Sequence, residues 1–147
     1  MRDLPRQLTV DELADLFQAR SRFVERLAGE EDPLGRARAV LAELPEEQRV
    51  EALAHHPRIG APSLSGRSAA EQGDPAAEEP EVLAELAELN AAYEERFGFR
   101  FVVFVDRRPR AQIVGVLRER LERTREEELE TGCDELVAIA VDRWRSS

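Results

Sequence analysis

The segment LNAAYEERFGFRFVV, residues 89–103, joins a helical pattern to a short apolar run. Apolar residues recur at helical spacing from Pro80 to Arg96, and Gly98 then supplies a stop. The following run, Phe99 to Val105, is aromatic and β-branched, but a single strand cannot form a sheet. We therefore expect one helix followed by buried extended chain, with Asn90 and Tyr93 as buried polar anchors on the helix.

The rest of the chain shows further helical patterns separated by Pro, Gly and capping residues. Helices are expected from the capping box at Thr9 to Glu12 as far as Leu27 with a stop at Gly29, from Asp32 through Leu41, from Pro45 into the histidines, from about Pro109 to Arg123, and from the capping box at Thr124 and Glu127 through Trp144. The segment from Pro57 to Gly66 is expected to be a loop, and the stretch between Ser68 and Pro80 has room only for a short helical turn.

Length and composition indicate a soluble single domain. A chain of 147 residues can form one core, so residues 1–147 are expected to be one domain. Hydrophobic residues make up 42% and charged residues 35%, which is typical of a globular protein. No apolar run approaches the ~20 residues of a membrane span, and the first ten residues lack an apolar signal core. We therefore expect a cytoplasmic protein without a membrane partner.

The charged and sulfur-containing residues exclude several function classes. A net charge of −10 without a basic stripe argues against nucleic acid as a partner. All 21 cationic residues are arginines, so Schiff-base lysine chemistry is excluded. Cys133 is the only cysteine, and the two adjacent histidines point apart, so neither a disulfide nor a metal site is expected.

The histidines lie in the segment HHPRIGAPSLSGRSAAEQ, residues 55–72. Pro57 disfavours helical backbone at the preceding residue, which places His56 at a helix C-terminus. The partial negative charge of a helix C-terminus favours imidazolium, so we expect His56 to be protonated nearer neutrality and able to act as an acid. His55 would then point away from it. The alternative is that these residues only cap helices, as Ser68 and Glu71 would in an S-x-x-E capping box.

Four motifs, in order and separation, resemble the family of 2-oxo-4-hydroxy-4-carboxy-5-ureidoimidazoline (OHCU) decarboxylases. They are HPRIG at 56–60, S-x-x-EQ at 68–72, LNAAYEERFGFRFVV at 89–103 and IAVDR at 139–143. The resemblance implies urate degradation with (S)-allantoin as product, a small-molecule ureidoimidazoline substrate and a homodimer. Together with the helical patterns it predicts an all-α fold, a compact single-domain bundle of about seven to eight helices with one buried extended segment.

The resemblance also assigns roles to individual residues. His56, Glu71 and Arg143 match the catalytic residues of the family, and six positions match its substrate-binding residues: Pro57, Ser68, Gln72, Phe101, Val102 and Val103. Arg58 is a further candidate for binding an anion. Two departures affect the site, because the loop from Pro57 to Ser68 is short and because Trp144 follows Arg143 where Leu is more usual.

The chemistry of such a substrate needs no cofactor. Decarboxylation leaves a carbanion, and the C=N bond next to the carboxylated carbon can accept its electron pair. His56 would donate the proton, Glu71 would hold the substrate hydroxyl or His56, and the Arg143 fork would bind the carboxylate or urea oxygens. Two alternatives stay open. One is a hydrolase of a related ureide that uses His56 and Glu71, and the other is a non-enzymatic helical interaction module.

Overall fold

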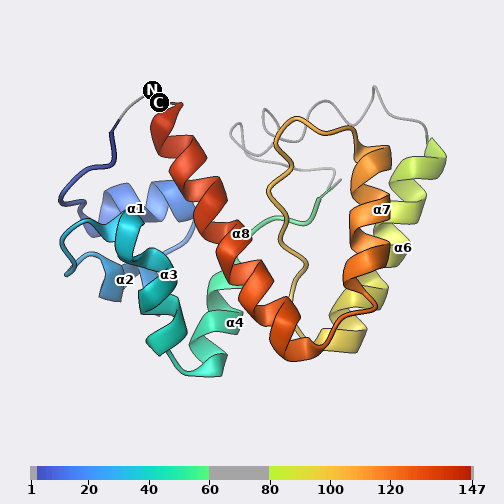
Figure 1. The fold of residues 1–147 in the computed structure, drawn as a ribbon, viewed down its shortest axis with the longest axis horizontal. Coiled ribbons are helices and arrows are strands. Elements are labelled where there is room, and N and C mark those ends of the chain that lie inside the picture. The colour runs from blue at the N-terminus through green and yellow to red at the C-terminus, as the bar shows by residue number, and fades with distance from the viewer. Residues whose placement is uncertain (1–2, 60–79, 147) are drawn as a thin grey trace.

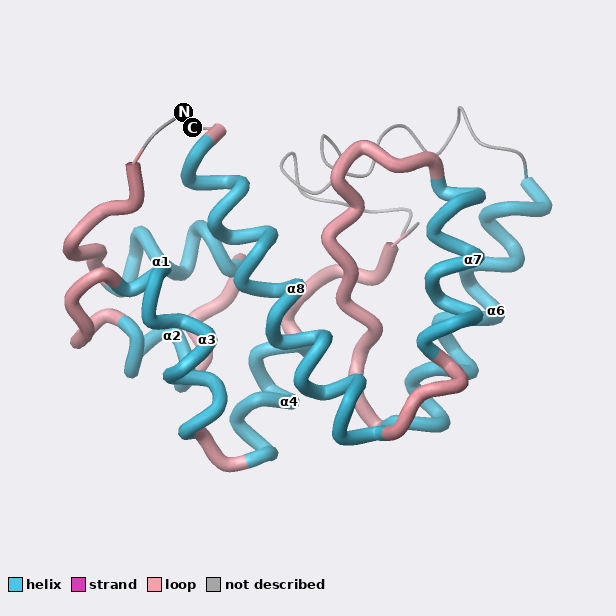
Figure 2. Tube along the Cα trace, in the orientation of Figure 1, coloured by secondary structure: helices cyan, strands magenta, loops and turns pink. Residues whose placement is uncertain are grey.

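The computed structural model describes residues 3–59 and 80–146, and over these ranges the chain contains helices and loops but no strand (Figure 2). The helices are α1 (Val10–Phe17), α2 (Arg22–Leu27), α3 (Pro33–Glu43), α4 (Glu46–Ala54), α6 (Pro80–Phe97), α7 (Arg110–Arg120) and α8 (Arg125–Arg145). These seven helices confirm the expected all-α bundle. Within the same ranges, no helix is both long and apolar enough to cross a membrane.

The long C-terminal helix α8 runs diagonally through the middle of the molecule (Figure 1). On one side it packs against α1, α3 and α4, which α2 links together. On the other side α6 and α7 form a pair, and the loop that joins α6 to α7 passes between this pair and α8 (Figure 1). One hydrophobic core extends through both groups of helices.

The extended segment 99–105 has the predicted character. Gly98 ends α6 with a φ of 79°, a left-handed conformation that favours glycine, and its N–H bonds to the Glu94 carbonyl at 2.9 Å. Phe101, Val102 and Val103 are buried without forming a strand. The aromatic rings of Tyr93 and Phe101 meet edge to face at 5.2 Å, so the segment is packed against α6.

The single helix expected from Thr9 to Leu27 is wrong, because the structure divides it into α1 and α2. Gln18 adopts a left-handed conformation with φ of 58°, and the Ser21 hydroxyl then accepts a hydrogen bond from the Val24 N–H to start α2. The turn brings the rings of Phe17 and Phe23 to 5.1 Å, and both are buried. Burial of these two rings favours the break over a continuous helix.

The capping boxes at Thr9 with Glu12 and at Thr124 with Glu127 are both formed. Pro33 and Pro45 stand at the starts of α3 and α4, as predicted. The starts of α1, α3, α4 and α8 therefore follow local sequence signals.

Candidate active site

The end of α4 separates the two histidines. His55 is the C-cap of α4 and is exposed, whereas His56 is buried with 6% of its surface accessible. The His56 N–H bonds to the Leu53 carbonyl at 3.1 Å, which turns the chain inward after the helix. His56 is thus the histidine inside the protein, directly after the helix end at which the sequence placed it, and Pro57 beside it is half-buried.

The expected charge of His56 is wrong for the ligand-free protein. Burial, together with the positive charges of Arg143 and Arg100, lowers the pKa of His56 from 6.5 to about 3, and burial is the largest of these causes. A helix C-terminus stabilises a cation by roughly 0.3–1 kcal/mol, which is less than one pKa unit. Desolvation and two nearby cations outweigh it, so His56 is a neutral imidazole at neutral pH.

This lowered pKa predicts a pH dependence of stability. Above a pH of about 3 the folded protein keeps His56 neutral, while in the unfolded chain the imidazole binds a proton below its ordinary pKa of 6.5. Between these values the unfolded state binds more protons, so stability falls as the pH falls, by up to about 1.4 kcal/mol per pH unit from this residue. Denaturant unfolding of the wild type and of His56→Gln, compared at several pH values, isolates the effect. A stability difference that does not shrink toward acid pH would contradict the neutral, buried imidazole.

Arg143 lies deep inside the protein. Only 3% of its surface is accessible, on the buried face of α8. Its Nη1 donates to the Leu16 carbonyl at 2.6 Å, in the last turn of α1, and its Nη2 donates to Oε1 of Gln18 at 3.2 Å. A buried guanidinium is therefore held against the end of α1, close enough to His56 to lower its pKa.

Trp144, the unusual neighbour of Arg143, takes part in a different contact. Its indole Nε1 donates to the Asp3 carbonyl at 2.7 Å. This bond links the end of α8 to the N-terminal part of the chain.

The extended segment is anchored through its main chain. The Val102 carbonyl accepts a hydrogen bond from Nη1 of Arg120 at 2.8 Å, and the Phe104 N–H donates to Oε1 of Glu135 at 3.3 Å. Arg100, at the start of the segment, donates to the His56 carbonyl at 2.8 Å. The segment with Phe101, Val102 and Val103 is therefore connected to the histidine by a direct contact.

A buried polar cluster behind this segment was missed in the sequence. Arg120 Nε donates to Oε1 of Glu128 at 2.7 Å, the Tyr93 hydroxyl donates to the same oxygen at 2.6 Å, and Arg123 Nη1 donates to Oε2 at 3.0 Å. Glu128 is fully buried, although it stands in the acidic run REEELE. The sequence signal that could have shown its burial is a spacing of four residues. At this spacing Glu128 lies on the same buried face of α8 as Gly132, Leu136 and Ala140.

The loop after His56 is fastened to α6 by two contacts. Asn90, buried as expected, donates from Nδ2 to the Ile59 carbonyl at 3.3 Å. Arg58 donates to Glu94 from Nε at 2.6 Å and from Nη2 at 2.9 Å. The two-point pair raises the pKa of Arg58 and lowers that of Glu94. Arg58 is therefore engaged with a carboxylate, which does not support its expected role as a free anion-binding group.

Ser68, Glu71 and Gln72 lie outside the described residues, so their predicted roles stay predictions. Within residues 3–59 and 80–146, the structure brings together His56, Arg143 and the segment that starts at Arg100. In those same ranges no three His, Cys, Asp or Glu side chains are placed to hold a metal ion.

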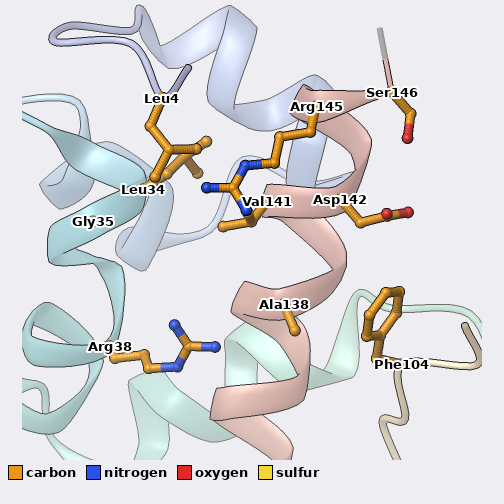
Figure 3. Close-up of a pocket in the computed structure, with 10 residues that line it drawn as sticks. All are labelled: Leu4, Leu34, Gly35, Arg38, Phe104, Ala138, Val141, Asp142, Arg145 and Ser146. Atoms are coloured by element: carbon orange, nitrogen blue, oxygen red, sulfur yellow. The ribbon is translucent and has the colours of Figure 1, made fainter. Parts of the chain in front are cut away.

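A separate pocket of about 690 Å³ opens between α3 and α8 (Figure 3). Figure 3 shows the guanidinium groups of Arg38 and Arg145 directed toward the space between α3 and α8, while the carboxylate of Asp142 points to the opposite side of α8. Neither His56 nor Arg143 lines this pocket. The residues of α8 that line it lie on the face of the helix opposite Arg143, and they are Ala138, Val141, Asp142 and Arg145. It is distinct from the site around His56.

Two solved structures are similar to this chain in their overall fold. A crystal structure of OHCU decarboxylase in the presence of (S)-allantoin has a TM-score of 0.74 and 26% identity, covering 90% of this chain and 94% of that one. A crystal structure of (S)-allantoin synthase, 19% identical with a TM-score of 0.67, has the same fold and covers 95% of this chain and 53% of that one.

Sequence comparison leads to the same family. The uric acid degradation bifunctional protein TTL of Arabidopsis thaliana is 36% identical over 98 residues. That match covers 61% of this chain and only 30% of the length of the plant protein. The family model for OHCU decarboxylase matches residues 2–145. Since this match extends over nearly the whole sequence, the chain belongs to the OHCU decarboxylase family.

Proposed function

We propose that this protein decarboxylates OHCU to (S)-allantoin in the degradation of urate. The observation that carries the proposal is the buried His56 beside the buried cation of Arg143, in a chain of this family. A histidine and an arginine withdrawn from water form a site that can bind an anionic ureide and move one proton. A purely structural helical module gives no reason to bury an imidazole next to two cations.

The reaction needs a proton at C5, the carbon that carries the ureido group, next to the carbon that loses the carboxylate. The C4–carboxylate bond breaks, CO₂ leaves, and the electron pair forms a C4=C5 bond while the pair of the adjacent C=N bond moves to nitrogen, which takes up a proton. The C4 hydroxyl then releases its proton as C4 becomes a carbonyl, and C5 receives a proton.

Burial is the main cause of the lowered pKa of His56, and the cations of Arg143 and Arg100 add to it. In this proposal the negative charge of the substrate carboxylate offsets the effect of the cations and stabilises the protonated imidazole. His56 can then take up a proton from solvent and deliver it to one face of C5, the carbon that becomes the stereocentre of (S)-allantoin.

The remaining residues would bind and orient the substrate. In this proposal Glu71 forms a hydrogen bond to the substrate hydroxyl or to His56, and Ser68 and Gln72 bind the ureide. Pro57, beside His56, contacts the substrate. Phe101, Val102 and Val103 present main-chain groups to the ring. The buried and anchored position of these three residues supports that role.

Three finer points belong to the same proposal. The reaction proceeds without metal or organic cofactor, because the substrate supplies its own electron sink. The protein acts in the cytoplasm, where the buried free thiol of Cys133 suits a reducing compartment. It works as a homodimer, a state supported by the family likeness and tested by light scattering after gel filtration.

The direct test generates the unstable substrate from urate with urate oxidase and hydroxyisourate hydrolase, and follows (S)-allantoin by circular dichroism. Addition of the protein should accelerate appearance of the optically active product, with and without a chelator. Hydrolysis products in place of (S)-allantoin, or activity that a chelator removes and one metal restores, would favour the ureide hydrolase instead.

Arg143→Lys is expected to lower kcat/KM on the order of 10²-fold although the charge is kept. One ammonium cannot hold the Leu16 carbonyl and Gln18 together and also bind a carboxylate through two parallel bonds. Steady-state kinetics measure the effect, and Arg145→Lys, an exposed arginine two residues on, is the matched control. Equal kinetics for the two variants would remove Arg143 from the site.

A further inference from the structure

Arg100 makes an unusual pair of contacts at the end of α4. Its Nη1 donates to the Ala54 carbonyl at 2.9 Å and to the His56 carbonyl at 2.8 Å. Both acceptors belong to the turn that carries His56, while Arg100 itself starts the buried extended segment after α6. One side chain thus joins two parts of the site that are 44 residues apart in the sequence.

The local sequence explains why this turn needs an outside donor. The last carbonyls of a helix lack intrahelical partners. His55 and His56 both donate to the Leu53 carbonyl, and Pro57 has no N–H to offer. Arg100 therefore supplies the hydrogen bonds for the Ala54 and His56 carbonyls, and its positive charge is favourable at a helix C-terminus.

We propose that Arg100 is a positioning residue for the reaction, which holds the His56 main chain at the end of α4 and so fixes where the imidazole stands. The proposal rests on the proposed role of His56. It assigns to Arg100 no contact with substrate. With the His56 N–H bound to Leu53 and its carbonyl bound to Arg100, the backbone is fixed on both sides of the residue.

The charges around this contact act in the same direction. Arg100 and Arg143 both lower the pKa of His56, from the loop after α6 and from α8 respectively. Burial and the positive charge of Arg58 lower the pKa of Arg100 itself, and the carboxylate of Glu94 on α6, which Arg58 holds, partly opposes this shift. Arg100 thus has two effects on His56, a fixed backbone position and a nearby positive charge.

The test compares Arg100→Met, which removes both effects, with Arg100→Lys, which keeps the charge and loses the two-bond geometry. Arg96→Met is the matched control, because Arg96 also donates to a carbonyl, that of Arg123, but outside the site. Each change is made in a His55→Gln background, so that His56 is the only imidazole of the chain. Its protonation is followed by nitrogen NMR from about pH 3, near the pKa of His56 in the wild type, up to about pH 8, and kcat and KM are measured in parallel.

For Arg100→Met we expect the pKa of His56 to move up toward its ordinary value and kcat to fall by about 10- to 100-fold, with a smaller change in KM. Arg100→Lys should keep the pKa closer to that of the wild type while kcat still falls. The control should change neither. A folded Arg100→Met protein with the imidazole signal and kcat of the wild type would overturn the proposal, and so would a shifted signal with unchanged kcat.

Failure of the decarboxylase proposal is recognised separately. If the wild type itself forms no (S)-allantoin, the proposed function fails, and the imidazole signal alone then decides whether Arg100 positions His56. If Arg100→Met unfolds, the pKa of His56 and kcat are measured in Arg100→Lys instead. Wild-type values of both the pKa and kcat in Arg100→Lys would count against the proposal.

Discussion

Replacing His56 with asparagine should lower kcat by about 10²- to 10⁴-fold, the range that a positioned proton donor contributes. Asparagine fits a buried polar position and can still donate and accept hydrogen bonds, but it cannot pick up and deliver a proton at neutral pH. The other histidine of the chain, His55, is exposed at the end of α4, whereas His56 is buried near Arg143. His55 therefore cannot replace the imidazole of His56. The rate of (S)-allantoin formation, measured by circular dichroism, gives the result.

His55→Asn is the matched control for this change. His55 is exposed and caps α4, so its replacement should leave turnover within a factor of about two and stability within roughly 0.5 kcal/mol. Far-ultraviolet circular dichroism should show the same helix content in both variants. If His55→Asn proves the more damaging of the two, the proton donor has been assigned to the wrong histidine.

Replacing Glu128 with alanine should destabilise the protein by about 3–5 kcal/mol. Glu128 is fully buried and accepts hydrogen bonds from Tyr93, Arg120 and Arg123. Its removal leaves the buried Arg120 cation without its carboxylate and the Tyr93 hydroxyl without its acceptor. The loss would be a large share of the 5–15 kcal/mol by which a domain of this kind is typically stable.

Urea unfolding measures this loss, with Glu130→Ala as the control on an exposed position of the same helix. Glu128→Gln should fall between the two, since its amide oxygen can still accept hydrogen bonds but carries no charge. Equal stability of Glu128→Ala and Glu130→Ala would mean that the buried ion pair contributes nothing. Loss of Glu128 should also loosen the Val102 carbonyl, because Arg120 holds both groups.

Local signals in the sequence predicted much of the fold. Pro33 and Pro45 mark helix starts, the two capping boxes form, and Pro57 ends α4 where expected. Such signals act over a few residues, so they can be recognised without knowledge of tertiary contacts. The break between α1 and α2 was missed because it depends on the packing of Phe17 against Phe23 inside the core.

The site residues named from the sequence stay predictions, and the electrostatics around His56 could not be predicted from the sequence. The sequence distinguished His56 from His55, and burial agrees with that choice. Its charge was not predictable, because it depends on Arg100 and Arg143, which are 44 and 87 positions away in the chain. Helix-end effects are local and weak, whereas desolvation is a property of the folded whole. Glu128 was missed because an acidic run resembles a solvated face.

The hydrogen bond between the Trp144 indole and the Asp3 carbonyl allows tryptophan fluorescence to report on the contact between α8 and the N-terminal part of the chain. Trp144 is the only tryptophan, and it is half-buried where the last helix meets the first described residues. Indole fluorescence responds to its immediate surroundings, while helical circular dichroism averages over all helices. Detachment of the N-terminal part from α8 can therefore be observed optically as an event distinct from global unfolding, without an added dye.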